Sequence, residues 1–337
     1  MKKAFNCFIA GLGRSGKDIH LKLINQMSNF SLVGVFDVDK KISRKIAKKY
    51  DCKFYDSYQN GLEDNAVDIV VIATPSALHY EMSLKAIKAN KHVILEKPLT
   101  STLKEFKDLT NYAKRKNVSV FPFFNFRFSP EFLKIQEILE KNLIGDIFLI
   151  KRNVGYFNRR SDWQSENSKF GGILNAAAIH HIDQILQLDK SGISRYFCDS
   201  KSLVSKGDAD DHIKILIKFK SSIIADIEVS WVESVKTYPW VIYGTKGSIL
   251  QKDNKIIVKF FKEEEVEIKK RNRYSYLSNE KINWHEECFV FDKKFALGIN
   301  VDFYISISQY LQKLTKQNPI PTSTVIKLLN FLEEIKD

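Results

Sequence analysis

Short apolar runs alternate with segments of helical spacing through the first 120 residues of the chain. The segment DIVVIATP at 68–75 is apolar almost throughout, as expected of a parallel strand covered on both faces. In the segment 76–91, Leu84 and Ile87 are spaced to lie on one face of a helix. This alternation predicts an α/β fold, a doubly wound parallel sheet of the Rossmann type. Strands are expected at 4–11, 30–39, 68–75 and 92–98, and helices at 14–27, 40–50 and 76–91.

After residue 121 the pattern changes to longer apolar runs, several of which alternate with polar positions. Such runs, joined by turns such as Lys246-Gly247, predict a large, mostly antiparallel sheet. Helices should cover one face and leave the other open. We predict a Rossmann domain at 1–122 and an α+β domain at 123–337. The strands are expected at 145–157, 212–231, 238–250 and 254–261, and the helices at 130–143, 173–188, 300–316 and 322–336.

The composition fits two globular domains. The chain has 337 residues, and 44% of them are hydrophobic, which is enough for two cores. No apolar run reaches the roughly twenty residues of a membrane span. The cysteines form no CxxC pair, so neither a zinc site nor a disulfide framework is predicted, and a reducing cytoplasm is favoured. The cysteines are Cys7, Cys52, Cys198 and Cys288.

The formal net charge of the chain is +13. The simplest interpretation is solvated lysine on helix faces. A positive field that attracts an anionic substrate is the second interpretation. Nucleic-acid binding comes third, because the basic residues are spread along the chain without a recognised binding module. We therefore predict neither a nucleic-acid partner nor a membrane partner.

The first predicted strand leads into a glycine-rich loop, within CFIAGLGRSGKDIH at 7–20. Gly11 would permit a tight turn, Gly13 would let the backbone approach a pyrophosphate, and Gly16 would let helix and strand pack closely. The N–H groups at the start of the next helix would then bind the phosphates. A plain turn between a strand and a helix is the alternative. The candidate cofactor-binding residues of the loop are Gly11, Gly13, Arg14, Ser15 and Gly16.

Asp37 favours a dinucleotide site, because it ends the second predicted strand about 20 residues after the last glycine of the loop. A carboxylate at this place accepts hydrogen bonds from the ribose hydroxyls of NAD. It would repel the 2′-phosphate of NADP, and no arginine follows immediately. The alternative is a turn aspartate that leads into the helix at 40–50. We predict NAD as the cofactor, with NADP less favoured.

From residue 73 onward the sequence resembles the Gfo/Idh/MocA oxidoreductases, which include glucose-fructose oxidoreductase and inositol dehydrogenase. The segment ATPSALHYEMSLKAIKANKHVILEKPLT, at 73–100, is similar to the family's strand-helix-strand unit that ends in Glu-Lys-Pro. Three further segments follow in the family's order. They are NFRFSP at 125–130, DWQSENSKFGGILNAAAIHHID at 162–183 and YGTKGSIL at 243–250. The resemblance implies a dehydrogenase or reductase that acts on a sugar, a sugar derivative or a cyclitol. Nucleotide-linked and acidic sugars are included among the sugar derivatives.

By this resemblance, Lys97 is the catalytic lysine, in contact with the substrate hydroxyl and the nicotinamide ribose. Oxidation of a secondary alcohol moves a hydride to the nicotinamide and a proton to a base. Lys97 follows a buried parallel strand, where open α/β sheets place ligands, and burial can lower a lysine's pKa toward neutrality. Glu96 and Pro98 are implied to shape the cofactor pocket. An ordinary lysine at a strand end is the alternative.

The resemblance also makes His180 the catalytic histidine, with Asp183 completing a His-x-x-Asp segment. His181 is the competitor, about 100° away on a helix. The family usually has a carboxylate four residues before this histidine, on the same helix face. Ala176 stands there in this chain, and Asn175 would point elsewhere on an α-helix. A second hypothesis is therefore a dinucleotide-binding regulator that has lost catalysis.

The remaining site residues are implied by the same resemblance. Core packing for Trp163 and a salt bridge for Arg127 are their alternative roles. Members of the family associate through the open sheet face, so we expect a homodimer or homotetramer. No metal site is predicted. The further cofactor-binding candidates are Thr74, Pro75, His79, Glu96, Lys97 and Asn125, and the substrate-binding candidates are Lys97, Arg127, Trp163, His180 and Asp183.

Overall fold

The structure is a computed structural model that describes residues 4–268, 280–291 and 295–336. The chain divides into two compact units. Unit 1 comprises residues 1–125, 166–171 and 297–337, and unit 2 comprises residues 126–165 and 172–296.

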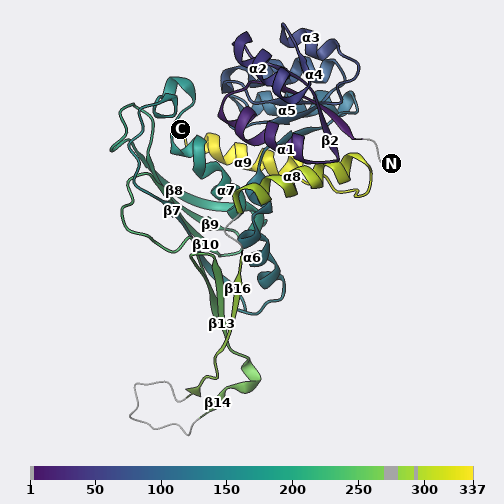
Figure 1. The fold of residues 1–337 in the computed structure, drawn as a ribbon. Helices are drawn as coiled ribbons and strands as arrows, with labels where there is room; N and C mark the ends of the chain where they lie inside the picture. Colours follow the sequence, from purple (N-terminus) through teal and green to yellow (C-terminus); the bar gives the residue numbers. More distant parts are fainter. Residues whose placement is uncertain (1–3, 269–279, 292–294, 337) are drawn as a thin grey trace. The chain divides into compact units, whose positions relative to one another are not determined.

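Unit 1 is built on a six-stranded sheet with the order β3-β2-β1-β4-β5-β6. Figure 1 labels β2 and the longer helices of this unit. Every neighbouring pair is parallel, which confirms the predicted Rossmann sheet. The strand order reverses between β1 and β4, and ligands bind beyond the carboxyl ends of the strands at such a point. The strands are β1 (Phe5–Ala10), β2 (Phe30–Phe36), β3 (Lys53–Phe54), β4 (Ile69–Ile72), β5 (His92–Leu95) and β6 (Val120–Pro122).

Burial follows the sequence pattern in unit 1. All four residues of β4 are buried, as its continuous apolar run predicts. The helix α5 begins with a capping box, in which Thr102 and Glu105 each bond to the other's backbone N–H. The helices are η1 (Ser15–His20), α1 (Leu21–Gln26), α2 (Lys40–Tyr50), α3 (Tyr58–Glu63), η2 (Ser76–Leu78), α4 (His79–Lys88), α5 (Leu103–Arg115), η5 (Asn167–Lys169), α8 (Phe295–Leu311, which enters the unit at 297) and α9 (Thr322–Glu334).

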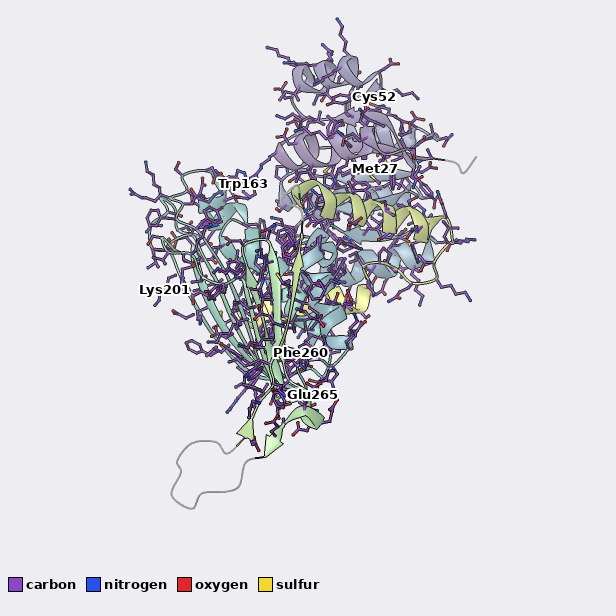
Figure 2. The ribbon with its side chains drawn as sticks, turned by 60° about the horizontal axis from the view of Figure 1, so that its bottom comes forward. Met27, Cys52, Trp163, Lys201, Phe260 and Glu265 are labelled. Atoms are coloured by element: carbon purple, nitrogen blue, oxygen red, sulfur yellow. The ribbon has the colours of Figure 1, made fainter. Side chains whose placement is uncertain are left out.

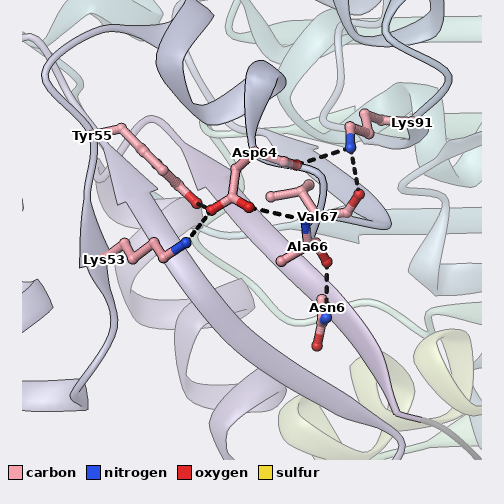
Figure 3. A network of polar contacts seen from close by, with 7 residues as sticks. All are labelled: Asn6, Lys53, Tyr55, Asp64, Ala66, Val67 and Lys91. Carbon is pink, nitrogen blue, oxygen red and sulfur yellow. Dashed lines mark hydrogen bonds and ion pairs between the residues drawn. The ribbon is translucent and has the colours of Figure 1, made fainter.

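A polar network joins β3 to the segment before β4, near the amino ends of the parallel strands (Figure 3). The Asp64 carboxylate accepts hydrogen bonds from the Lys53 ammonium, the Tyr55 hydroxyl at 2.7 Å and the Ala66 N–H at 2.9 Å. These three bonds lower the pKa of Asp64 to about 2. Lys91 donates to the Asp64 carbonyl at 3.0 Å. The network therefore fixes the end of the sheet opposite the carboxyl ends of the strands.

The two C-terminal helices, α8 and α9, belong to unit 1 and not to the predicted second domain at 123–337, where they were expected to cover the face of its sheet. Phe303 of α8 is fully buried, and its ring packs edge-on against Phe123 at 4.8 Å between centroids. On α9, Glu333 accepts a hydrogen bond from the Leu103 N–H at 2.6 Å. Helical spacing shows that a helix has an apolar face, but it does not show which sheet that face covers.

Unit 2 is built on an eight-stranded sheet with the order β16-β13-β12-β11-β7-β10-β9-β8. Only β7 and β10 pair in parallel, so the sheet is mostly antiparallel, as predicted. A small pair, β14 and β15, extends from one end. The strands are β7 (Ile147–Gly155), β8 (Ile193–Lys201), β9 (His212–Phe219), β10 (Ile224–Ser230), β11 (Trp240–Gly244), β12 (Gly247–Lys252), β13 (Lys255–Phe260), β14 (Glu267–Ile268), β15 (Glu280–Lys281) and β16 (His285–Val290).

The two faces of this sheet differ in exposure. Along β9, Ile215 and Ile217 are fully buried, whereas Leu216 between them is 39% exposed. The helix α6 (Pro130–Glu140) lies against β13, and α7 (Ile179–Leu188) lies against β10. Figure 2 labels Lys201, on the edge strand β8, and Phe260, on β13, which lies next to the opposite edge strand β16. Short helical turns are η3 (Asn125–Phe128), η4 (Trp163–Ser165), η6 (Leu174–Ala178) and η7 (Glu263–Glu265).

Candidate active site

The glycine loop connects β1 to η1 at the carboxyl edge of the unit 1 sheet. Gly11 has a φ of +93°, and an added Cβ would lie 2.5 Å from the Ala73 carbonyl oxygen, so a side chain does not fit there. A Cβ at Gly16 would lie 1.9 Å from the Gly11 oxygen. A Cβ at Gly13 would meet no atom within 4 Å. The loop is therefore tight at its two ends and open at its centre, which fits the close approach of a pyrophosphate.

The helix expected at 14–27 begins with a π-helical segment, Ser15–His20, and continues as α1. The Lys17 N–H bonds to the Gly13 carbonyl at 2.9 Å. Arg14 is exposed and Ser15 is partly exposed, so both can reach a ligand above the loop. His20, at the end of the π-helical segment, is fully buried.

Asp37 lies at the end of β2 and bonds to the glycine loop. Its Oδ2 accepts a hydrogen bond from the Leu12 N–H at 2.7 Å, and its Oδ1 accepts one from the Asp39 N–H at 2.9 Å. Asp39, not Asp37, caps α2, because its side chain accepts from the N–H groups of the first helical turn. Each carboxylate oxygen of Asp37 keeps acceptor capacity for a ribose hydroxyl.

The Glu-Lys-Pro segment follows β5 at the same edge of the sheet. Glu96 is buried, its Oε1 lies 3.0 Å from His20 Nε2, and its Oε2 accepts the Lys97 N–H at 3.2 Å. Burial raises the pKa of Glu96, but the hydrogen bond from His20 and the charges of His20 and Lys97 outweigh it and lower that pKa to about 2. Glu96 is therefore a buried carboxylate next to Lys97, and Lys97 itself is half-buried.

The loop after β4 brings three further candidates to this edge. Pro75 is exposed, and the Thr74 hydroxyl donates to Met82 Sδ at 3.4 Å. His79 is 1% exposed, and its ring nitrogens lie 2.7 Å from the Pro98 carbonyl oxygen and 2.9 Å from the Thr74 carbonyl oxygen. His79 thus lies beneath the loop and joins the end of β4 to the Glu-Lys-Pro segment.

In unit 2, the two adjacent histidines of α7 have different surroundings. His180 is buried and stacks on Phe126, with 4.5 Å between ring centroids. His181 Nδ1 lies 3.0 Å from Arg152 Nη2. Burial, and then the charge of Arg152, lower the pKa of His181 well below its usual value. His181 is therefore a neutral residue of the unit 2 core.

The candidates Arg127 and Asp183 bind each other. Arg127 Nε and Nη2 donate to the two carboxylate oxygens of Asp183 at 2.7 and 2.6 Å, and both residues are buried. A bidentate pair of this kind has a fixed geometry and largely cancels its own charge. Asn125, in unit 1, donates to Asn300 Oδ1 at 2.6 Å.

The helix before His180 is not a regular α-helix. Residues Leu174–Ala178 form the π-helical segment η6, and the Ile179 N–H bonds to the Leu174 carbonyl five residues earlier. A π-helical turn holds more residues than an α-helical one, so the residue five positions earlier comes closer to the same face. Asn175 is five positions before His180. On an α-helix, by contrast, the side chain of Asn175 would point away from the face of His180.

Trp163 lies at the start of η4, and 48% of its surface is exposed (Figure 2). Tyr156 and Phe157, which follow β7 in the same unit, are also more than half exposed. Among the described residues, no three His, Cys, Asp or Glu side chains are grouped as a metal site would require. In the same part of the chain, no helix has both the length and the apolar composition to cross a bilayer.

Two residues that contact this edge of the sheet were not among the predicted site residues. His20 contacts Glu96, and Tyr304 contacts His20 at 2.7 Å. The position of His20 in the helix after the glycine loop was visible in the sequence, but its burial depends on the π-helical segment. Tyr304 lies 284 positions away, and no local pattern links it to the loop.

Similar proteins match most of the length of this chain. An uncharacterized oxidoreductase of Synechocystis sp. is 30% identical over 274 residues, which are 75% of this chain and 74% of that protein. A crystal structure of an NAD-binding protein from Listeria innocua has a TM-score of 0.83 and 25% identity, and covers 99% of this chain and 97% of that one.

Named relatives differ in cofactor. A scyllo-inositol 2-dehydrogenase (NAD⁺) of Bacillus subtilis is 28% identical and covers 74% of each chain. A scyllo-inositol 2-dehydrogenase (NADP⁺) of the same organism is 29% identical and covers 53% of this chain and 50% of that protein. Likeness to relatives alone therefore does not fix the cofactor.

The family itself is decided by two matching models. The oxidoreductase family model with an NAD-binding Rossmann fold matches residues 5–124, and the model of the family's C-terminal domain matches residues 132–250. These matches cover the glycine loop, the Glu-Lys-Pro segment and the His-x-x-Asp segment. The chain belongs to the Gfo/Idh/MocA family and is an NAD(P)-dependent oxidoreductase.

Proposed function

We propose that this protein is an NAD-dependent dehydrogenase or reductase that acts on a secondary hydroxyl or keto group of a sugar, a sugar derivative or a cyclitol. The observation that carries the proposal is the convergence of three elements at one edge of the unit 1 sheet. The glycine loop follows β1, Asp37 ends β2, and Lys97 follows β5. The carboxyl ends of parallel strands meet there, at the place where open α/β sheets bind ligands.

NAD, when bound, supplies the hydride acceptor. The open backbone at Gly13 would receive its pyrophosphate, and Asp37 its ribose hydroxyls. Lys97 removes the proton of the substrate hydroxyl, and His180 has the role of the family's catalytic histidine. We assign both residues by their match to the family's Glu-Lys-Pro and His-x-x-Asp segments.

The preference for NAD rests on Asp37. Its carboxylate is held by two backbone N–H groups and would repel a 2′-phosphate. The purified protein is therefore expected to bind NAD(H) more tightly than NADP(H) in calorimetry, and Asp37→Ser should narrow the difference. Equal affinity of the unmodified protein for the two cofactors would contradict the assignment.

The relatives and the net charge support the proposed substrate class. Inositol dehydrogenases are among the named relatives, and the net charge of +13 favours an anionic substrate. The exposed ring of Trp163 suits the apolar face of a sugar. A screen of cyclitols, sugars, acidic sugars and sugar nucleotides for NADH production tests the class. Activity should be lost in Lys97→Ala, and inactivity with every compound would count against an enzyme.

A regulator that binds the dinucleotide without turnover is the second candidate. It is favoured by Ala176, because the family's usual carboxylate is missing four residues before His180. NAD binding with no turnover in the same screen would support it. Turnover of any compound that depends on Lys97 would exclude it.

We also propose a cytoplasmic location, since the four cysteines are free thiols and such thiols persist in a reducing compartment. Titration with a thiol reagent after denaturation in the absence of reductant should find four thiols. A lower number in protein isolated without reductant would point to an oxidising compartment.

A further inference from the structure

Two buried histidines of unit 1 contact the residues on either side of Lys97. His20 contacts Glu96, the residue before it, and His79 contacts Pro98, the residue after it. We propose that His20, held by Tyr304, and His79 are positioning residues that fix Lys97 for proton transfer. The proposal rests on the role of Lys97 proposed above.

The contact before Lys97 is a continuous chain of hydrogen bonds. Tyr304 Oη lies 2.7 Å from His20 Nδ1, and His20 Nε2 lies 3.0 Å from Glu96 Oε1. The ionised Glu96 carboxylate can only accept, so His20 carries a hydrogen on Nε2 and donates it to Glu96, an assignment made from these contacts. The Tyr304 hydroxyl is bonded to the other ring nitrogen, Nδ1. Tyr304 thereby fixes the orientation of the ring that donates to Glu96.

The carboxylate at the end of this chain holds the backbone of Lys97. Glu96 Oε1 is engaged by His20, and Oε2 accepts the N–H of Lys97 at 3.2 Å. A carboxylate pinned through one oxygen presents the other in a fixed place. The Lys97 amide is therefore held by Tyr304 through two intervening side chains.

Aromatic packing keeps the chain rigid. The His20 ring lies 4.5 Å from the Phe123 ring between centroids, and the Tyr304 ring packs edge-on against Phe30 at 5.1 Å. His20 and Tyr304 are both fully buried, so neither ring can exchange its partner for water. A positioning role requires this rigidity, because the Glu96 carboxylate must stay in place when the Lys97 side chain moves.

The contact after Lys97 comes from a different element. His79 is the first residue of α4, and its two ring nitrogens face the carbonyl oxygens of Pro98 and Thr74. It connects the end of β5 to the end of β4. Lys97 thus extends from a backbone held on one side by the glycine-loop helix and on the other by α4. A displacement of about 1 Å at a reacting group can cost roughly 10²-fold in rate.

Tyr304→Phe is the sharpest test, because it removes one hydroxyl and keeps the ring packing. Tyr310→Phe, on the same helix and with its ring edge-on to Phe121, is the matched control. Hydrogen–deuterium exchange of the whole purified chain should be faster in Tyr304→Phe within the peptide that spans Glu96 and Lys97. Exchange in the other strands of unit 1 should be unchanged, and Tyr310→Phe should match the unmodified protein. Unchanged exchange at Glu96 and Lys97, or faster exchange throughout unit 1, would overturn the proposal.

Kinetics supply the second readout. A positioning defect should lower kcat in Tyr304→Phe by up to roughly 10²-fold, with little change in the KM for NAD. His20→Gln, whose amide can still donate to Glu96, should recover part of the activity that His20→Ala loses. A rise in KM for NAD with an unchanged kcat would refute positioning. If the unmodified protein turns over no substrate, the proposed function fails, and the exchange experiment still decides whether Tyr304 holds the Lys97 backbone.

Discussion

At the scale of single residues, Lys97 and His180 are expected to contribute unequally to catalysis. Lys97 follows a buried carboxylate, whereas Ala176 replaces the acid that usually assists the histidine. Lys97→Ala should therefore lower kcat more than His180→Ala does, by a general-base loss of roughly 10²–10⁴-fold. Steady-state kinetics of the two variants with one substrate measure this. Equal losses would mean that the histidine is an obligatory relay.

The π-helical segment before His180 changes which residue can assist that histidine. Asn175, five positions earlier, comes closer to its face than α-helical spacing allows. A carboxylate there favours imidazolium, so Asn175→Asp should move the acid limb of the kcat profile to higher pH. Ala176→Asp, four positions before His180, is the matched comparison and should move it in the same direction. An unchanged profile in Asn175→Asp beside a shifted one in Ala176→Asp would show that the α-helical spacing holds in solution.

Residue positions that depend on linear spacing were predictable, and pairings that depend on distant packing were not. The glycine loop, Asp37 and Lys97 each stand at the end of a predicted strand, so the sheet alone brings them to one edge. For Arg127 a salt bridge was the expected alternative and is present, but its partner Asp183 was not predictable, because the pairing depends on how η3 meets α7. Tyr304 could not be linked to His20 by any spacing, since the two lie 284 positions apart.

At the scale of elements, the sequence contains a recognisable start signal for the helix α5. The helix α5 was not predicted, although Thr102 and Glu105 have the spacing of a capping box and Phe106 and Leu109 lie on its buried face. The π-helical segments were not accessible in this way, because no propensity distinguishes them from α-helix. The docking of α8 and α9 in unit 1 was also hidden, since an apolar face does not name its partner.

The place of α8 predicts a stability effect. Phe303 is fully buried against Phe123, so Phe303→Ala should lower the free energy of unfolding by about 3–5 kcal/mol. Leu314→Ala, at an exposed position just after α8, should change it by less than about 0.5 kcal/mol. Urea unfolding followed by circular dichroism compares the two variants. Similar small losses in both would contradict the packing of α8 in unit 1.

The network at the amino ends of the strands predicts an acid dependence. The folded-state pKa of Asp64 is about 2, below the roughly 3.9 of an unfolded aspartate. Its stabilisation is therefore complete above about pH 4 and is lost as the pH falls toward 2. Asp64→Asn should lower Tm clearly at pH 6 and progressively less between pH 4 and pH 2. A Tm difference that does not change with pH would exclude this carboxylate as the cause.

At the scale of the whole molecule, the open face of the unit 2 sheet carries apolar side chains in register. Ile224 of β10 is paired with Leu149 of β7, which is paired with Tyr243 of β11. Ile224 and Tyr243 are both exposed, and so is Leu216 of β9 on the same face. Lys214 on that face pairs with Asp226 at 2.6 Å, so the apolar row is bordered by ions that cancel locally. A face of this composition suits a second copy of the chain better than it suits an anionic polymer, in spite of the net charge of +13.

Association through this face can be tested by disrupting the row with charge. We expect the unmodified protein to be a dimer or tetramer by light scattering at micromolar concentration. Leu216→Asp should lower the mass toward that of one chain, 39.0 kDa, because two copies that associate through this face would have to bury the new carboxylates. Leu314→Asp adds the same charge at an exposed position of unit 1 and should leave the mass unchanged. NAD binding should persist in both variants, since the glycine loop lies in unit 1, so a lower mass cannot be attributed to unfolding. A monomeric unmodified protein would contradict the proposed interface. An unchanged mass in Leu216→Asp would show that the chains associate through another face.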